Sequence, residues 1–183
     1  MVTFTNSRRL SLALLSILVL FSLLLGAGGT GCKSKSERRE IEPQSQAGGV
    51  GNPAIDFSLE DLDGNIISLK GLKGQVVLLN FWATRCRYCV AEMGLLENIH
   101  LNYDQAAVVT INVGEKKDKV RQFIDASNFS FPVLLDPKGT LFRAYGFSGY
   151  PATVIINQEG IITASRIGYT DEATLLQLLD TAH

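Results

Sequence analysis

The 183-residue sequence has few residues that bind metals and little excess charge. It contains three cysteines and two histidines, and 17 Lys and Arg nearly balance 18 Asp and Glu, for a formal net charge of −1. Such a balance lacks the positive excess typical of nucleic-acid-binding proteins, so we expect no nucleic-acid partner. Zinc sites usually need four ligands. Besides Cys86 and Cys89 the chain offers Cys32, His100 and His183, which makes a structural zinc site the weaker interpretation, and we predict no metal.

A long hydrophobic run lies at the N-terminus. Arg8 and Arg9 precede an apolar stretch over residues 10–25, and small residues follow it, which is typical of a secretory signal. Residues 1–31 are therefore predicted to be a signal segment outside the fold. Residues 32–52 are charged and then rich in Gln, Ser and Gly without apolar periodicity, which predicts a flexible tether.

The rest of the chain is organised around the run from Val76 to Trp82, which is apolar except for Asn80. A run without polar alternation predicts a strand covered on both faces, as in an α/β sheet. Cys86 and Cys89 follow at the start of a helical pattern. Unpaired backbone N–H groups and the helix dipole favour a thiolate there. We therefore predict Cys86 as the nucleophile and Cys89, one turn further on the buried stripe, as the resolving thiol.

A strand followed by Cys-x-x-Cys and a helix is a fairly specific signal for a redox-active dithiol. Two alternatives remain open. Because the chain looks exported, the pair could be a purely structural disulfide. The two thiolates could also bind Cu(I), in which case the protein would be a copper-handling module.

Three charged residues near the dithiol are candidates for a role in the reaction. Glu92 lies three residues after Cys89 and so shares its helix face. A partly buried carboxylate with a raised pKa suits transfer of the Cys89 proton, and the alternative is an ion pair at the rim. Arg85 and Arg87 flank Cys86, where they either stabilise its thiolate or are solvated surface charges.

The other predicted elements follow from hydrophobic periodicity and turn residues. A hairpin is predicted in residues 55–73, around Asp63-Gly64-Asn65. The order of strands and helices after residue 76 favours right-handed βαβ crossovers. The further strands are expected at residues 106–113, 133–135, 152–156 and 161–165, and the further helices at residues 117–127 and 171–182.

Two segments carry a resemblance to a known family. Residues 80–84 (NFWAT) and residues 149–153 (GYPAT) resemble the thioredoxin fold, in particular the TlpA/ResA/CcmG-type thiol-disulfide oxidoreductases of the AhpC/TSA-related redoxin superfamily, over about residues 53–183. The resemblance implies an α/β thioredoxin-like fold, with a central mixed sheet flanked by helices and an added N-terminal hairpin. It also supports Glu92 as a functional residue. Arg85 departs from the family's usual Trp at its position.

The same resemblance implies a substrate-binding surface around the dithiol. The Tyr150–Pro151 bond is predicted to be cis, since X-Pro bonds adopt this form at modest cost and a strand begins abruptly here. Its loop should lie against the cysteines and present the Tyr150 backbone to an extended peptide. The residues predicted to bind substrate are Trp82, Arg85, Arg87, Tyr88, Tyr150 and Pro151.

These observations predict an extracytoplasmic, membrane-anchored thiol-disulfide oxidoreductase that acts as a reductant of proteins and needs no cofactor. Residues 29–32 resemble a bacterial lipobox, which would make Cys32 the lipidated residue; an uncleaved signal anchor and a soluble exported form are the alternatives. The family implies apocytochrome c as substrate and an integral membrane thiol carrier as electron donor. A peroxiredoxin-like peroxidase is the other enzyme considered, although no Pro-x-x-x-Thr-x-x-Cys pattern ends at Cys86.

Overall fold

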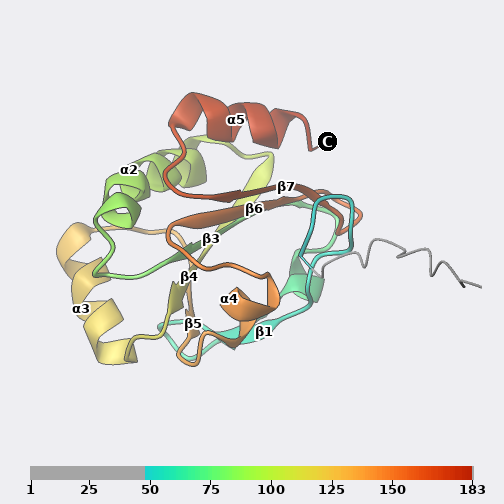
Figure 1. Cartoon of the computed structure of the whole chain (residues 1–183). Helices are drawn as coiled ribbons and strands as arrows, with labels where there is room; N and C mark the ends of the chain where they lie inside the picture. The colour runs from blue at the N-terminus through green and yellow to red at the C-terminus, as the bar shows by residue number, and fades with distance from the viewer. Residues whose placement is uncertain (1–47, 183) are drawn as a thin grey trace, which may run out of the picture. The chain divides into compact units, whose positions relative to one another are not determined.

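The computed structural model describes residues 48–182, and five of the strands there form one mixed sheet in the order β5-β4-β3-β6-β7 (Figure 1). The central strand β3 runs parallel to β4 and antiparallel to β6. All seven residues of β3 are buried, including Asn80, as the lack of polar alternation in its sequence predicted. The strands are β3 (Val76–Trp82), β4 (Ala106–Val113), β5 (Val133–Asp136), β6 (Ala152–Ile156) and β7 (Ile162–Ile167).

A small antiparallel hairpin precedes this sheet, as predicted. Its strands are β1 (Ser58–Glu60) and β2 (Ile66–Ser68). In the turn between them, the Asp61 carboxylate accepts hydrogen bonds from the backbone N–H groups of residues 63 and 65, both at 2.8 Å. A short 3-10 helix, η1 (Leu69–Leu72), follows β2 and was not predicted.

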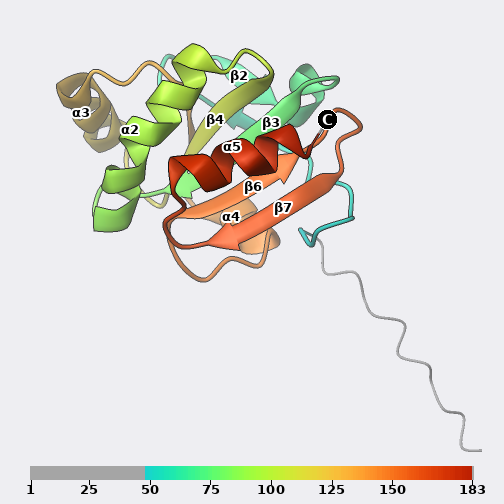
Figure 2. The same ribbon diagram turned by 90° about the horizontal axis from the view of Figure 1, so that it is seen from above.

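Helices cover both faces of the sheet. The helices are α2 (Arg87–Asn102), α3 (Lys117–Ser127), α4 (Thr140–Ala144) and α5 (Glu172–Asp180). Seen from above, α2 and α5 lie over the same face of the sheet, and α4 lies beneath it (Figure 2).

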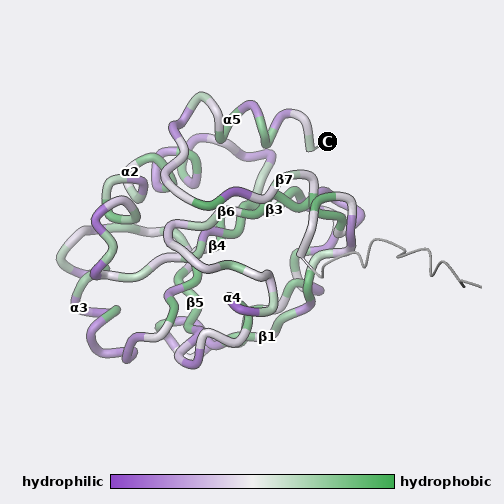
Figure 3. Tube along the Cα trace, in the orientation of Figure 1, coloured by the Kyte–Doolittle hydropathy of each residue, from purple (hydrophilic) through white to green (hydrophobic). Residues whose placement is uncertain are grey.

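Two hydrophobic cores result, one on each face of the sheet. Leu78 points into the core under α2, α3 and α5, and Leu79 into the core over α4. This division follows from the alternation of side chains along a strand. The hydropathy colouring is accordingly green along the central strands and largely purple on α3 at the periphery (Figure 3).

The folded part begins before residue 53, where the sequence placed its boundary. The Gly51 N–H donates to the Ile162 carbonyl at 2.8 Å, and Pro53 forms a β-bridge with Ile161. The predicted signal segment, Cys32 and most of the predicted tether lie outside the described residues. Within residues 48–182, no helix is long and apolar enough to span a membrane.

Candidate active site

The two cysteines lie where β3 ends and α2 begins, and they form a disulfide. Cys86 is the N-cap of α2: its backbone is extended, and its sulfur accepts a hydrogen bond from the Cys89 N–H at 3.1 Å. Cys86 is partly exposed, whereas Cys89 is 1% exposed. A partner can therefore reach Cys86 first, and in the reduced protein the helix N-terminus favours its thiolate.

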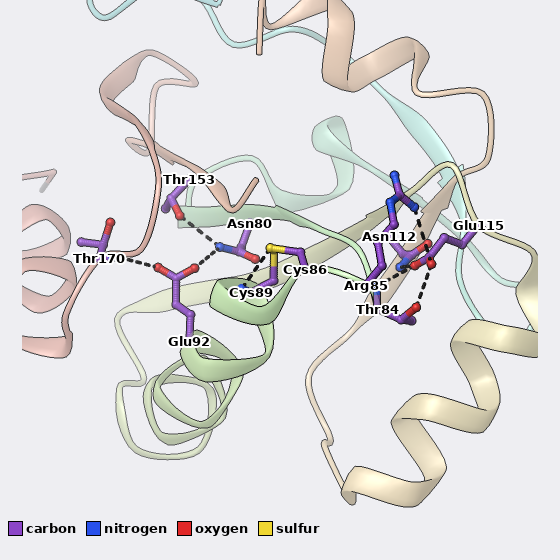
Figure 4. Close-up of a disulfide and its surroundings, with 10 residues drawn as sticks. All are labelled: Asn80, Thr84, Arg85, Cys86, Cys89, Glu92, Asn112, Glu115, Thr153 and Thr170. Atoms are coloured by element: carbon purple, nitrogen blue, oxygen red, sulfur yellow. Dashed lines mark hydrogen bonds and ion pairs between the residues drawn. A yellow bond between two sulfur atoms is a disulfide. The ribbon is translucent and has the colours of Figure 1, made fainter. Parts of the chain in front are cut away.

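Glu92 is fully buried behind the dithiol, on the same face of α2 as Cys89. One carboxylate oxygen accepts from the Asn80 side chain at 3.1 Å, and the other from the Thr170 N–H at 2.9 Å (Figure 4). Asn80 also donates to the Thr153 hydroxyl at 3.1 Å. Burial raises the pKa of Glu92, although both hydrogen bonds oppose the effect. The carboxyl can thus exchange a proton nearer to neutral pH than an exposed glutamate can.

A second buried carboxylate, Glu115, holds the segment that leads into the dithiol. It follows β4 and accepts hydrogen bonds from both the N–H and the hydroxyl of Thr84 at 2.7 Å. The Asn112 side chain donates to it at 2.9 Å, and the Arg85 guanidinium lies 3.6 Å away (Figure 4). The Lys119 ammonium also donates to it, at 2.6 Å. These donors outweigh the opposing effect of burial and lower the pKa of Glu115 to about 2.

The loop before β6 lies beside the dithiol segment. Its Tyr150–Pro151 peptide bond is cis, which confirms the prediction. Ala152 pairs with Phe81 in the sheet, so Pro151 is placed next to the end of β3. The Tyr150 ring stacks on Phe142 at 4.5 Å between centroids, and the Arg85 guanidinium carbon lies 5.9 Å from the Tyr150 ring centre.

With this geometry established, the comparisons with known proteins identify the family. The model of the AhpC/TSA family matches residues 50–165. The chain belongs to that family.

Relatives of this AhpC/TSA-family protein include thiol-disulfide oxidoreductases. The thioredoxin-like protein YneN of Bacillus subtilis is 37% identical over 88% of this chain and 94% of its own. The thiol-disulfide oxidoreductase ResA of Halalkalibacterium halodurans is 34% identical over 72% of this chain and 76% of its own. The structure of the exposed lipoprotein thioredoxin Etrx1 of Streptococcus pneumoniae matches with a TM-score of 0.65 and 29% identity, over 69% of this chain and 99% of that one. The predicted fold and general activity, thiol-disulfide oxidoreduction, are confirmed.

The structure places most of the predicted substrate-binding residues of this AhpC/TSA-family protein at its surface. Arg85, Arg87 and Tyr88 are exposed, and the Arg87 guanidinium carbon lies 5.5 Å from the Tyr88 ring centre. Trp82 and Pro151 differ, because both are buried. Trp82 has no exposed surface, and its ring centre lies 5.5 Å from that of Phe123. A side chain without exposed surface supports the dithiol from beneath and does not contact a partner in this state. The roles of these residues in the reaction stay predictions.

Sequence reasoning missed Glu115 and the partners of Glu92. A signal for Glu115 was present, since polar residues that follow neighbouring parallel strands meet at the same edge of the sheet. Thr170 carried no such signal, because its contact with Glu92 joins residues 78 positions apart. Within residues 48–182, no three Cys, His, Asp or Glu side chains lie close enough together to hold a metal ion.

Proposed function

We propose that this oxidoreductase is an extracytoplasmic, membrane-tethered reductant of protein disulfides. The observation that carries the proposal is the position of Cys86, a partly exposed sulfur at the N-cap of α2, in front of the buried Cys89 and Glu92. This order suits a nucleophile, a protected resolving thiol and a proton acceptor. The dithiol is the complete redox group of the proposed reaction, so no cofactor is needed.

The proposed reaction has two exchange steps. The Cys86 thiolate attacks one sulfur of a substrate disulfide, a mixed disulfide forms, and one substrate thiolate leaves. Cys89 then loses its proton to Glu92 and attacks the Cys86 sulfur, which releases the second substrate thiolate and leaves the Cys86–Cys89 disulfide. The dithiol gives up two electrons and the substrate disulfide gains them.

The proposed location and partners rest on the N-terminal sequence and on the relatives. The N-terminal sequence resembles an exported lipoprotein, which would tether the domain through Cys32, and Etrx1 is described as an exposed lipoprotein. The resemblance to the ResA group makes apocytochrome c, with its haem-attachment cysteines, the proposed substrate. An integral membrane thiol carrier would return two electrons to the disulfide after each turnover.

The reduction potential of the full-length protein tests the proposed direction. We expect about −250 mV or lower from equilibration with glutathione or dithiothreitol buffers, near the value of reducing thioredoxins. A value near −120 mV, typical of strong oxidants, would contradict a reducing role. The Cys86→Ser variant is the matched control, since it cannot form the disulfide and should show no transition.

Two separate measurements distinguish the proposed function from two other activities. The family match makes a peroxidase the second candidate, so peroxide consumption by the reduced protein is measured beside disulfide reduction. Turnover of peroxide faster than of protein disulfides would favour that candidate. Tight, stoichiometric Cu(I) binding without disulfide exchange would instead favour a copper-handling module.

A further inference from the structure

Two unlike surfaces lie on opposite sides of the dithiol. The sheet order places the end of β4 and the start of α3 on one side of Cys86, and the start of β6 and the end of β7 on the other. Figure 4 shows this separation: Arg85 and Glu115 lie on one side of the disulfide, and Thr153 and Thr170 on the other. A chain bound across the dithiol would therefore meet both surfaces.

The side next to β4 carries excess positive charge. Arg85, Lys116 and Lys119 are exposed there, and Arg87 is exposed at the start of α2. Three carboxylates oppose these four cations: the buried Glu115 and Asp136 and the exposed Asp118. Glu115 is shared by Lys119 and Arg85. Among the described residues, no ion pair neutralises Arg87 or Lys116. We call these four cations the basic rim.

Within the basic rim, Arg85 contacts the cis-proline loop. Glu115 lies 3.6 Å from its guanidinium, and the Tyr150 ring lies beneath it at 5.9 Å. These two contacts hold the Arg85 guanidinium next to the cis-proline loop, while 59% of the Arg85 side chain stays exposed. A guanidinium held in this way can pair with a carboxylate of a bound partner.

The side next to β7 exposes two apolar side chains beside one cation, Arg166. Ile167 is 55% exposed and Tyr169 is 47% exposed. Ile167 pairs with Ala152, directly after the cis-proline, and a carbon added at Gly149 would meet its side chain at 3.4 Å. Tyr169 precedes Thr170, whose N–H binds Glu92. These two residues form what we call the apolar rim.

We propose that the two rims select protein segments in which an acidic residue lies on one side of the reacting cysteine and an apolar residue on the other. The acidic side chain pairs with the basic rim, and the apolar side chain covers Ile167 and Tyr169. This proposal deepens the proposed function and rests on it, because it names the class of substrate for the same dithiol. Charge complementarity of this kind acts mainly on association rate and specificity.

The probes are short peptides with one central cysteine joined by a disulfide to 5-thio-2-nitrobenzoate. The Cys86 thiolate attacks the peptide sulfur and the coloured thiolate leaves; Cys89 then closes the disulfide and frees the peptide thiol. The prereduced full-length protein supplies both electrons, so one turnover is observed. Two peptides carry Glu and Leu on opposite sides of the cysteine, in either order, and two others carry Lys in place of Glu.

We expect one order of Glu and Leu to react fastest, by about fivefold or more over its Lys counterpart at low ionic strength. Each rate is divided by that of the same peptide with dithiothreitol, which removes the effect of charge on the disulfide itself. The advantage should shrink in concentrated salt, because the screening length is already about 10 Å at 0.1 M. Equal normalised rates for all four peptides would overturn the proposal, whereas no reaction with any peptide would overturn the proposed function itself.

Variants of this protein test whether the residues of the two rims cause the preference among the peptides. The double variant Lys116→Gln, Lys119→Gln should reduce the Glu-over-Lys preference to about half or less, since two charges of the basic rim are removed. Lys73→Gln is the matched control, because Lys73 is exposed at the opposite end of the sheet, before β3 begins, and it should keep the full preference. A fifth peptide carries Ser in place of Leu in the faster Glu-containing order, and Ile167→Ser should weaken the preference for Leu over Ser. A preference unchanged in the double variant would show that the basic rim does not select the substrate.

Discussion

The Glu115→Gln variant tests whether the buried carboxylate holds the dithiol segment through its charge. Glutamine keeps the shape of the side chain but loses the charge and one acceptor oxygen. The N–H of Thr84, the amide of Asn112 and the ammonium of Lys119 all donate to that carboxylate, at 2.7, 2.9 and 2.6 Å. The NH2 group of glutamine would face some of these donors, and each of those donors would then lack an acceptor.

The size of the effect follows from the pKa of Glu115. A carboxyl pKa of about 2 in the folded protein, against an ordinary value of 4.5, corresponds to about 3 kcal/mol at about 1.36 kcal/mol per pKa unit. Lys119, one of the donors that lower this pKa, has a side chain that is 57% exposed, so solvent screens its share. We therefore expect the variant to lose about 2 to 3 kcal/mol of unfolding free energy at pH 7.

The pH dependence has a definite sign. Because the pKa of Glu115 is lowered on folding, its contribution is complete above pH 4.5 and is lost as the pH falls toward 2. At pH 3 more than half of the difference between wild type and variant should be gone. The measurement is urea unfolding of both oxidised proteins at pH 7 and pH 3, followed by the fluorescence of Trp82, the single tryptophan.

A matched control separates this effect from a general change in charge. Glu159→Gln removes the same charge from an exposed turn, and we expect it to change stability by under about 0.5 kcal/mol at either pH. If Glu115→Gln cost the same free energy at pH 7 and pH 3, or cost no more than the control, the carboxylate would not hold the segment through its charge.

The remaining predictions concern the chemistry of the dithiol. Cys89→Ser should accumulate mixed disulfides with substrate proteins, and Cys86→Ser should accumulate none, as seen on non-reducing gels; equal trapping would contradict the assigned order. Glu92→Gln should slow the second exchange step by about tenfold or more and leave the first largely intact, because an amide cannot accept the Cys89 proton; rapid mixing separates the steps, and wild-type rates for both would make Glu92 structural. Arg87→Gln should slow alkylation of the reduced protein by iodoacetamide at pH 7 a fewfold, if its charge favours the Cys86 thiolate; an unchanged rate would leave Arg87 as a surface charge.

Much of the fold was predictable because local signals agreed with the tertiary structure. The lack of polar alternation along β3 indicated a strand buried on both faces, and the structure confirms it. Helix α3 has the predicted bounds, since its apolar residues recur at helical spacing. Helix α4 was missed because five residues are too few to show a helical period. It forms where Asp136 accepts hydrogen bonds from the N–H groups of Thr140 and Phe142.

The sequence predicted the reactive residues of the candidate site, but it did not predict the long-range contacts that support them. Cys86, Cys89 and Glu92 are close in sequence, so helix geometry alone relates them. Glu115 contacts Thr84 across 31 residues, and this contact depends on β4 lying beside β3. Contacts of that kind follow from strand order, which local periodicity does not encode.

The pairing of the first described residues with β7 determines where the chain enters the domain relative to the dithiol. Residues 51–54 bond to the start of β7, near Ile162, whereas Ile167 at the other end of the strand lies beside the cis-proline loop. Five residues of strand separate these points, which is about 16 Å. The chain thus joins the domain at the end of the sheet remote from the sulfurs. A support or fusion partner attached ahead of residue 48 would therefore join the domain at the end away from Cys86, and the attachment point itself would leave that sulfur open to large partners.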